Sequence, residues 1–318
     1  MNNSSSTDSR RILVLGGDGF VGTNVVGVLR EEGLDPTILS RKTGIDLRQR
    51  AAVGDFLSDH KPDFIVNCAA HVGSLNYVTQ QAADVIYDNS LMLLNLYQSV
   101  VDACPNAVII NPIANCAYPA TSTTFREDEW WNGHLHRSVL SYGATRRHMW
   151  AISECYEMQH NVRTVSLLVP NMYGPHDSED PNKAHALNAL ACKFLRASKD
   201  GSAVTVWGTG IAVREWLYAA DFGRIIAEII RSDARMIGLE EPLNIAQNFG
   251  LSVRELVGIL TQHFGGSIDV QWDKDRPDGA PRKVMDDSRF RRVFPDFQFK
   301  TLESGLIDTI AYYESLNA

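Results

Sequence analysis

The sequence predicts an α/β protein whose core is a doubly wound parallel sheet, with a smaller C-terminal part that binds a ligand. Apolar β-branched runs alternate with helical patterns from Arg11 onward, the runs are continuously apolar, and a glycine-rich turn follows the first of them. Strands that are apolar throughout are covered on both faces, which is typical of a parallel sheet. Repeated strand–helix units of this kind predict a Rossmann-type fold.

The elements follow one another regularly through the first 170 residues. The predicted strands are RRILVLG, PTILS, DFIVNCAA, AVIINPI and VRTVSLLVP. Helical patterns begin near Gly19, run from Arg48 to His60 and from Ala83 to Cys104, and include Tyr142.

After Pro170 a segment rich in Gly, Pro and Asp interrupts the alternation. We therefore expect a disordered tail over residues 1–10 and a Rossmann-type domain over 11–170. A substrate-binding part over 171–318 follows, from which some chain returns to the first domain.

Composition excludes several classes of protein. The 318 residues carry a formal charge of −8, and no run of Lys or Arg suggests a nucleic-acid partner or an anionic membrane. No stretch of 18 apolar residues occurs and the N-terminus is polar, so we expect neither a membrane span nor a secretory signal. The five cysteines include no CxxC pair, which predicts buried free thiols and a cytoplasmic protein.

The glycine-rich turn predicts a dinucleotide site. Gly16, Gly19 and Gly22 lie between a strand and a helix, where glycine lets the backbone turn tightly and approach a pyrophosphate at the helix N-terminus. At the end of the second strand, Ser40 and Arg41 replace the carboxylate that would bind a ribose hydroxyl. This pair favours NADP over NAD.

Two further places carry candidate acid–base groups. Tyr142 and Arg146 are four residues apart in a predicted helix, so their side chains share one face. His71 follows the third predicted strand and should face the ligand cleft at the carboxyl edge of the sheet. We interpret all three as candidate catalytic residues.

Several long blocks carry a family resemblance, namely CAAHVGSLNY, PIANCAYP, VPNMYGPHD, VWGTGIAVREW and RPDGAPRKVMD. With the glycine turn, they resemble the extended short-chain dehydrogenase/reductases, the NAD-dependent epimerase/dehydratase family, and most closely the GDP-L-fucose synthases within it. The resemblance implies a GDP-sugar ligand and a homodimer formed through the helices Ala83–Cys104 and Tyr142–His160.

The resemblance also implies roles for individual residues. In that family a Ser, a Tyr and a Lys serve hydride transfer with NADP, and a Cys and a His act as acid and base in epimerisation. The Tyr falls on Tyr142, the Cys on Cys116 and the His on His185. The Ser falls on Ala114 and the Lys on Arg146, so two members of the hydride-transfer set are replaced.

The residues that the resemblance assigns to the GDP-sugar are all polar or aromatic, as pyrophosphate neutralisation and base contacts require. They are Asn171, Lys193, Trp207, Arg214, Asp278 and Lys283. The nucleotide-sugar half of the predicted site is thus complete.

Asp18 is a third departure, because the family commonly has an Arg at this place near the NADP phosphates. Together with Ala114 and Arg146, it counts against NADP(H) as a cofactor. The main hypothesis is therefore a non-redox isomerase or mutase that interconverts pyranose and furanose forms of a GDP-hexose, such as GDP-L-galactose or GDP-L-fucose.

A divalent metal bridging the phosphates is compatible with the mutase hypothesis, although no ligand cluster is visible in the sequence. Two alternatives stay open. One is an NADP-dependent GDP-sugar epimerase-reductase with an unusual Tyr–Arg pair. The other is an inert GDP-sugar-binding protein, against which the presence of Tyr142, Cys116 and His185 speaks.

Overall fold

A single parallel sheet organises the first part of the chain. The structure, a computed structural model, describes residues 10–180, 183–232, 241–276 and 278–316. Six strands lie in the order β10-β5-β4-β3-β1-β2, and every neighbouring pair is parallel. They are β1 (Ile12–Leu15), β2 (Thr37–Leu39), β3 (Phe64–Asn67), β4 (Val108–Ala114), β5 (Thr164–Val169) and β10 (Leu243–Asn244).

The first five strands are the apolar runs that the sequence predicted, so the Rossmann-type fold class is confirmed. β10 comes from the C-terminal half and extends the sheet beside β5. Apart from Arg10, the predicted N-terminal tail lies outside the described residues.

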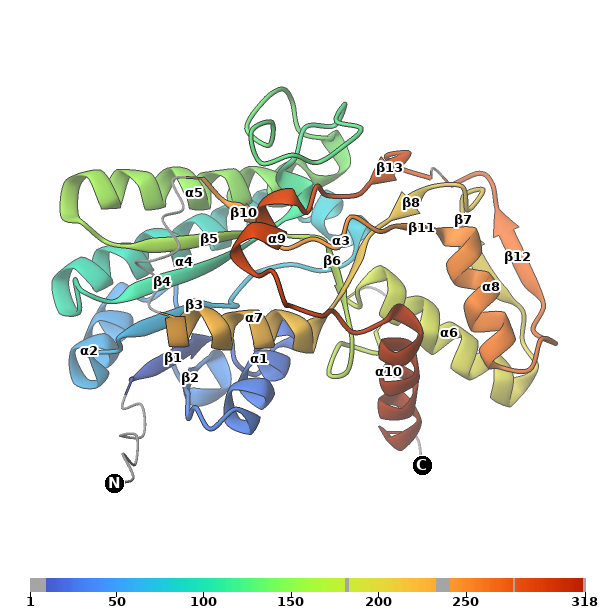
Figure 1. Cartoon of the computed structure of the whole chain (residues 1–318), viewed down its shortest axis with the longest axis horizontal. Helices are drawn as coiled ribbons and strands as arrows, with labels where there is room; N and C mark the ends of the chain where they lie inside the picture. The colour runs from blue at the N-terminus through green and yellow to red at the C-terminus, as the bar shows by residue number, and fades with distance from the viewer. Residues whose placement is uncertain (1–9, 181–182, 233–240, 277, 317–318) are drawn as a thin grey trace.

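Helices cover both faces of this sheet (Figure 1). α1 (Phe20–Glu31) and α7 (Ala219–Ser232) pack together on one face, and the other face carries α2 (Arg50–His60), α4 (Ala82–Ala103) and α5 (Leu140–His160). Successive side chains of a strand point to opposite faces. Thus Ile12 and Val14 join one apolar core while Leu13 and Leu15 join the other, which explains why the strand is apolar throughout.

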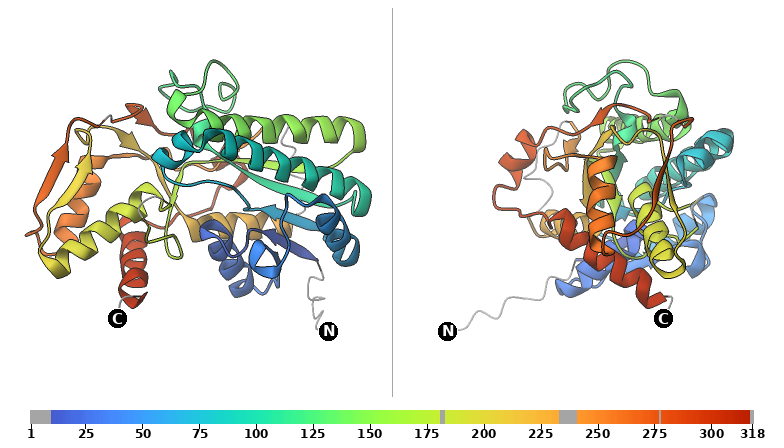
Figure 2. Two further views of the ribbon diagram at one scale, coloured as in Figure 1. Left: turned by 180° about the vertical axis from the view of Figure 1, so that it is seen from behind. Right: turned by 90° about the vertical axis from the view of Figure 1, so that its right-hand side faces the viewer.

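A second lobe lies beyond one end of the sheet (Figures 1 and 2). Its helices are α6 (Ala186–Asp200), α8 (Val253–His263) and α10 (Leu302–Leu316). Its strands pair as β7 (Val204–Trp207) with β12 (Val270–Asp273), β6 (Asn171–Tyr173) with β9 (Trp216–Tyr218), and β8 (Val213–Arg214) with both β11 (Leu251–Ser252) and β13 (Arg282–Lys283). α9 (Ser288–Val293) returns to the sheet domain, where Phe290 joins its core.

Short segments leave the carboxyl ends of the strands at the edge that faces the second lobe. They are η1 (Arg41–Thr43) after β2, α3 (Leu75–Gln80) after β3 and η2 (Asn115–Ala117) after β4, while η3 (Arg137–Val139) precedes α5. Open α/β sheets bind their ligands at this edge. The candidate site is therefore built from these segments and from the loops of the second lobe.

Two predictions from composition can be compared with the structure. Among the described residues, no helix is both long and apolar enough to cross a membrane. All five cysteines are unpaired, but Cys155 is exposed and Cys68 and Cys192 are only half-buried. The expectation that the thiols are buried is therefore wrong for Cys155, which lies on the outer side of α5.

Candidate active site

The glycine turn forms a close backbone cradle. Gly16 has a φ of +69°, and a Cβ there would lie 2.8 Å from the Cα of Ala69. At Gly22 a Cβ would lie 2.1 Å from the carbonyl oxygen of Gly16, so the first turn of α1 packs directly on the loop. Gly19 precedes α1 and has no side-chain cap, which leaves backbone N–H groups at the helix N-terminus for an anion.

A cavity of about 520 Å³ opens beside this turn. Such a volume falls within the usual range for small-molecule sites, about 300–1,000 Å³. The predicted residues Gly16, Gly19, Arg41 and His71 line it, whereas Gly22 serves packing. The lining also includes residues that no sequence pattern indicated, namely Lys42, Asp46, Arg48, Tyr77, Asp88, Met92 and Lys183.

Asp18 also lines the cavity, as the sequence suggested. Its carboxylate accepts a hydrogen bond from the hydroxyl of Ser40, the N-cap residue of η1. The Asp18 side chain therefore does not cap α1. It links the glycine turn to the end of β2.

His71 is held in place from both sides. Its Nδ1 lies 2.9 Å from a carboxylate oxygen of Asp88, and its Nε2 lies 2.7 Å from the hydroxyl of Tyr77. Asp88 also forms an ion pair with Arg48, whose guanidinium binds Asp46 as well. Since both ring nitrogens of His71 have partners, its predicted role as a free acid–base group requires that one of these contacts breaks.

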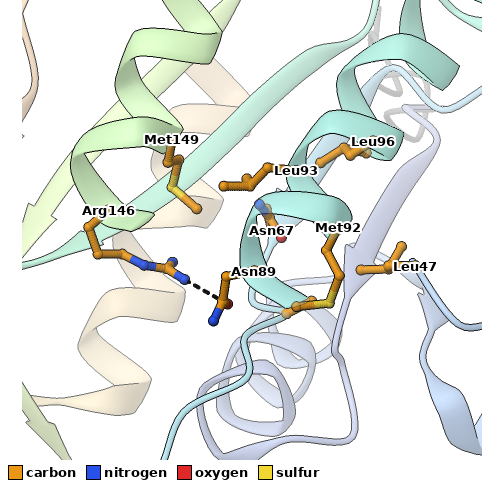
Figure 3. A pocket seen from close by; sticks show the side chains of 9 residues that line it. Leu47, Asn67, Asn89, Met92, Leu93, Leu96, Arg146 and Met149 are labelled. Carbon is orange, nitrogen blue, oxygen red and sulfur yellow. Dashed lines mark hydrogen bonds between the residues drawn. The ribbon is translucent and has the colours of Figure 1, made fainter. Parts of the chain in front are cut away.

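Tyr142 and Arg146 lie on one face of α5, as their spacing predicted. The guanidinium carbon of Arg146 lies 4.6 Å from the centroid of the Tyr142 ring, which is cation–π geometry. Figure 3 shows the guanidinium directed toward α4, where it donates a hydrogen bond of 3.2 Å to the side-chain oxygen of Asn89. Burial raises the pKa of Tyr142, and the charge of Arg146 opposes this effect.

Arg146 is almost completely buried, and its Nε has no hydrogen-bond partner. A small cavity beside it, about 10 Å³, has room for about one water molecule. It is lined by apolar side chains and by Asn67 and Asn89 (Figure 3). Buried N–H groups normally have a hydrogen-bond acceptor, so the Arg146 Nε–H is expected to bind a water molecule or a polar group of a ligand.

Cys116 lies in η2, which packs against α5 at Gly143, the residue after Tyr142. A Cβ at Gly143 would lie 2.6 Å from the carbonyl oxygen of Cys116, so only glycine permits this approach. Burial raises the pKa of the Cys116 thiol, while the charges of Lys283 and Arg146 lower it. The structure thus brings four predicted residues together, namely Cys116, Tyr142, Arg146 and Lys283.

His185 precedes α6 and is fixed by Asp177. One carboxylate oxygen of Asp177 accepts a hydrogen bond of 2.7 Å from the backbone N–H of His185 and lies 3.1 Å from its Nδ1. The imidazole packs on Phe20 of α1, with ring centroids 4.9 Å apart. His185 therefore reaches from the second lobe to the first turn of the helix that follows the glycine turn.

The other predicted substrate residues lie in the second lobe, where backbone groups already engage most of them. Asp278 accepts hydrogen bonds from the backbone N–H groups of Thr209 and Gly210 and from the Thr209 hydroxyl. Arg214 donates to the carbonyl oxygens of Val213, Asp278 and Ala280. Asp278 thus holds a turn, and a guanine contact would have to compete with these bonds.

Asn171, Lys193 and Trp207 differ in how accessible they are. The Asn171 side chain donates to the backbone oxygen of Glu215, and Lys193 donates to that of Thr205. Burial lowers the pKa of Lys193. Trp207 is exposed, and the guanidinium of Arg276 lies over its ring at 5.1 Å, so a base that stacks on this face would have to displace Arg276.

Glu215 is a buried carboxyl that sequence reasoning missed, although it lies in the quoted block VWGTGIAVREW. It accepts hydrogen bonds from the backbone N–H groups of Gln247 and Met285 and is fully buried. Burial raises the pKa of Glu215 to about 7. Its place next to Arg214, which the family resemblance assigns to the substrate, is the only hint in the sequence. Its hydrogen-bond partners lie 32 and 70 residues away along the chain.

Metal binding has no visible site in the described part of the chain. No group of three or more His, Cys, Asp or Glu side chains there is arranged to hold a metal ion. The divalent metal considered from the sequence therefore has no ligand set among these residues.

Known proteins match this chain over nearly its full length. The model of the NAD dependent epimerase/dehydratase family matches residues 12–246. GDP-L-fucose synthase 1 of Arabidopsis thaliana is 30% identical over 312 residues, which cover 98% of this chain and 95% of the relative. GDP-L-fucose synthase of Azorhizobium caulinodans is 28% identical, and the match covers 96% of each chain. The structure of a GDP-L-fucose synthetase from Naegleria fowleri bound to NADP has a TM-score of 0.86 at 23% identity, covering 98% and 94% of the two chains.

These comparisons overturn two predictions from the sequence. The non-redox mutase hypothesis is wrong, since the relatives are GDP-L-fucose synthases, and so is the inference that NADP(H) has been lost, since the similar structure holds NADP. The effect of each substitution depends on the side chains around it. Arg146 keeps a positive charge on Tyr142, and Asp18 is engaged by Ser40.

Proposed function

The chain belongs to the NAD dependent epimerase/dehydratase family, and we propose that it is an NADP-dependent epimerase-reductase that acts on a GDP-sugar. The observation that carries this proposal is the cluster of Tyr142, Arg146 and Cys116 at the sheet edge that also holds the glycine cradle. The names of the relatives, GDP-L-fucose synthases at up to 30% identity, support the same substrate class.

The residues around the cavity fit a dinucleotide. The turn at Gly16 and Gly19 admits a pyrophosphate because side chains are absent there, and α1 directs backbone N–H groups toward it. Arg41 and Lys42 follow β2, the place that receives the ribose and its phosphate in Rossmann folds. When bound, NADPH supplies the hydride that reduces a carbonyl group.

Tyr142 serves as the proton donor for that reduction. Burial raises its pKa, so the phenol is protonated at neutral pH and can give its proton to the carbonyl oxygen of the sugar as hydride arrives. The positive charge of Arg146 over the ring stabilises the tyrosinate that this transfer leaves. Asn89 holds the guanidinium in this position.

Cys116 and His185 serve the epimerisation. A base removes a proton from the carbon next to a ketone, and an acid returns a proton to the opposite face of the same carbon. Because Asp177 engages Nδ1 of His185, Nε2 is the nitrogen left for proton transfer. The Cys116 thiol is protonated as burial dictates, while Lys283 and Arg146 reduce the cost of forming a thiolate.

The GDP part of the substrate is assigned to the second lobe. Burial lowers the pKa of Lys283, which makes its ammonium group receptive to a phosphate that replaces the lost hydration. Trp207 offers an exposed ring for stacking once Arg276 is displaced, and Arg214 adds a second cation. Three further side chains complete the proposed binding set, namely Asn171, Lys193 and Asp278. Each hydrogen-bonds to backbone groups and so holds a neighbouring segment in place.

The test is turnover of a panel of GDP-4-keto sugars with the purified enzyme. We expect loss of nicotinamide absorbance that depends on both NADPH and the sugar, with a reduced GDP-sugar identified by mass and NMR. Solvent deuterium at carbons next to the ketone reports the epimerisation separately. Conversion of a GDP-sugar that proceeds equally well without NADPH would refute the proposal.

We also propose a homodimer formed through α4 and α5. These adjacent helices expose the large apolar side chains Ile86, Tyr87, Leu94 and Met158, and such surfaces mark interfaces. Light scattering after gel filtration should give twice the mass of the chain for the parent and a smaller mass for the double variant Tyr87→Glu, Leu94→Glu. A monomeric parent would rule out this dimer.

Five unpaired cysteines in one chain favour a reducing compartment, where thiols persist. We therefore propose a cytoplasmic location. Cell fractionation of the tagged protein tests it, and recovery with disulfide-bonded extracellular proteins would contradict it.

A further inference from the structure

The glycine turn has an electrostatic problem that its own residues do not solve. Asp18 lines the cavity at the turn where the dinucleotide phosphates are expected, and a carboxylate there repels them. The Ser40 hydroxyl hydrogen-bonds this carboxylate but adds no positive charge. A compensating cation has to come from elsewhere on the cavity wall.

Three other cations line the cavity wall, namely Arg41, Lys42 and Arg48. Arg48 binds Asp46 and Asp88 at 2.6 and 3.1 Å, so its charge is balanced within the protein. Arg41 and Lys42 lie in η1 beyond β2, at the ribose end of a Rossmann dinucleotide site. With Arg48 balanced and Arg41 and Lys42 assigned to the ribose end, Lys183 is the remaining cation among the residues that line the cavity.

Lys183 reaches the same cavity from the second lobe. Its side chain is exposed, and its ammonium nitrogen lies 3.7 Å from Asp180, a loose surface pair of little energetic weight. Lysine suits an approach to phosphates from a distance, because it is a compact charge on a flexible stem.

Two residues that flank Lys183 in sequence, Pro175 and His185, contact α1. The Asn24 side chain donates a hydrogen bond of 2.8 Å to the carbonyl oxygen of Pro175. The ring of His185, two residues after Lys183, packs on Phe20, the first residue of α1. These two contacts lie near the N-terminus of the helix that receives the phosphates.

We propose that Lys183 is a cofactor-binding residue that offsets, from the second lobe, the negative charge which Asp18 places at the glycine turn. The two side chains thus bring opposite charges to the wall of one cavity. The inference rests on the proposed function in that the anion is the pyrophosphate of NADP(H). It adds a binding residue that the family resemblance did not assign.

The test is equilibrium binding of NADPH to the full chain without any GDP-sugar, followed by calorimetry or by nicotinamide fluorescence. Lys183→Gln should weaken NADPH binding about tenfold, the lower end of the effect of one charge-assisted contact. Added salt should weaken binding more steeply in the parent than in this variant. Lys199→Gln, an exposed lysine near the end of α6, is the matched control and should change nothing.

A charge reversal at Asp18 makes the test specific to the electrostatic link between Asp18 and Lys183. Asp18→Arg should tighten NADPH binding in the parent and should restore it in the Lys183→Gln background to within about threefold of the parent. GDP binding should stay the same in all variants. Unchanged NADPH binding in Lys183→Gln would overturn the inference, whereas a parent that binds no NADPH at all would instead overturn the proposed function.

Discussion

Replacing Arg146 with Met tests whether the buried cation over Tyr142 assists proton transfer. Arg146 is 2% exposed, and its Cζ lies 4.6 Å from the Tyr142 ring centroid. At that distance a full charge on the ring would gain about 4 kcal/mol at an effective dielectric constant of about 20. With about half of the charge developed in the transition state, we expect the loss to be about 2 kcal/mol, which lowers kcat about 30-fold.

The assay is NADPH oxidation with a saturating GDP-4-keto sugar, measured from neutral to alkaline pH. Reduction requires protonated Tyr142, so the rate falls as pH rises through the pKa of Tyr142. The charge of Arg146 lowers this pKa. The alkaline limb of the pH–rate profile should therefore move to higher pH in Arg146→Met. Arg146→Lys keeps the positive charge. It should leave the alkaline limb of the pH–rate profile in place and should keep kcat within about tenfold of the parent value.

Binding of GDP and the thermal midpoint serve as controls, because Met fills a similar buried volume without a charge. A kcat in Arg146→Met equal to that of the parent, with an unmoved alkaline limb, would refute the role of the cation. A fall in kcat without movement of the limb would assign Arg146 to packing alone.

Three further predictions concern the other carboxyl and thiol groups. Cys116→Ser should lower solvent deuterium uptake at the carbon next to the ketone at least a hundredfold, yet retain NADPH oxidation with a sugar that needs no epimerisation; equal loss of both would contradict the separate roles. Asp177→Asn should lower the epimerisation rate about tenfold to a hundredfold with little change in the KM for NADPH, because His185 loses the carboxylate that orients its ring; unchanged deuterium uptake would refute this. Burial raises the pKa of Glu215 from 4.5 to about 7, so its contribution to stability is complete below pH 4.5 and is lost as pH rises to 7, by about 3 kcal/mol. Urea titrations at pH 5 and pH 7.5 should show this fall in the free energy of unfolding for the parent and a smaller fall for Glu215→Gln. An equal fall in both proteins would contradict the prediction.

Sequence alone predicted the features that depend on local spacing. The five strands follow from continuously apolar runs, the glycine turn from three glycines between a strand and a helix, and the Tyr142–Arg146 pair from the helical period of 3.6 residues. The structure reproduces all of them. The contacts of Cys116 depend on Gly143, 27 positions later in the printed sequence, whose missing Cβ lets η2 approach α5. No local pattern encodes such a pairing, so the resemblance to a family supplied it.

The partners of His71 and His185 lay beyond prediction for a related reason. Asp88 and Tyr77 come from α4 and α3, whose relative placement follows from tertiary packing. Asp177 lies close to His185 in sequence, but the chain between them is irregular and His176 has a left-handed backbone, so no helical or strand spacing predicts their contact. A histidine in the sequence is a candidate acid or base, and its partners decide which nitrogen is available.

The hypothesis of a lost cofactor failed because it counted substitutions and not their electrostatic surroundings. Arg146 retains the charge that the tyrosinate needs and gains a fixed position from Asn89. Asp18 is one charge in a cavity wall that also contains Lys183, which the sequence places 165 residues away. Binding energy depends on the sum of charges around the ligand, so a reversed charge on one loop is tolerated when a facing loop supplies the opposite charge.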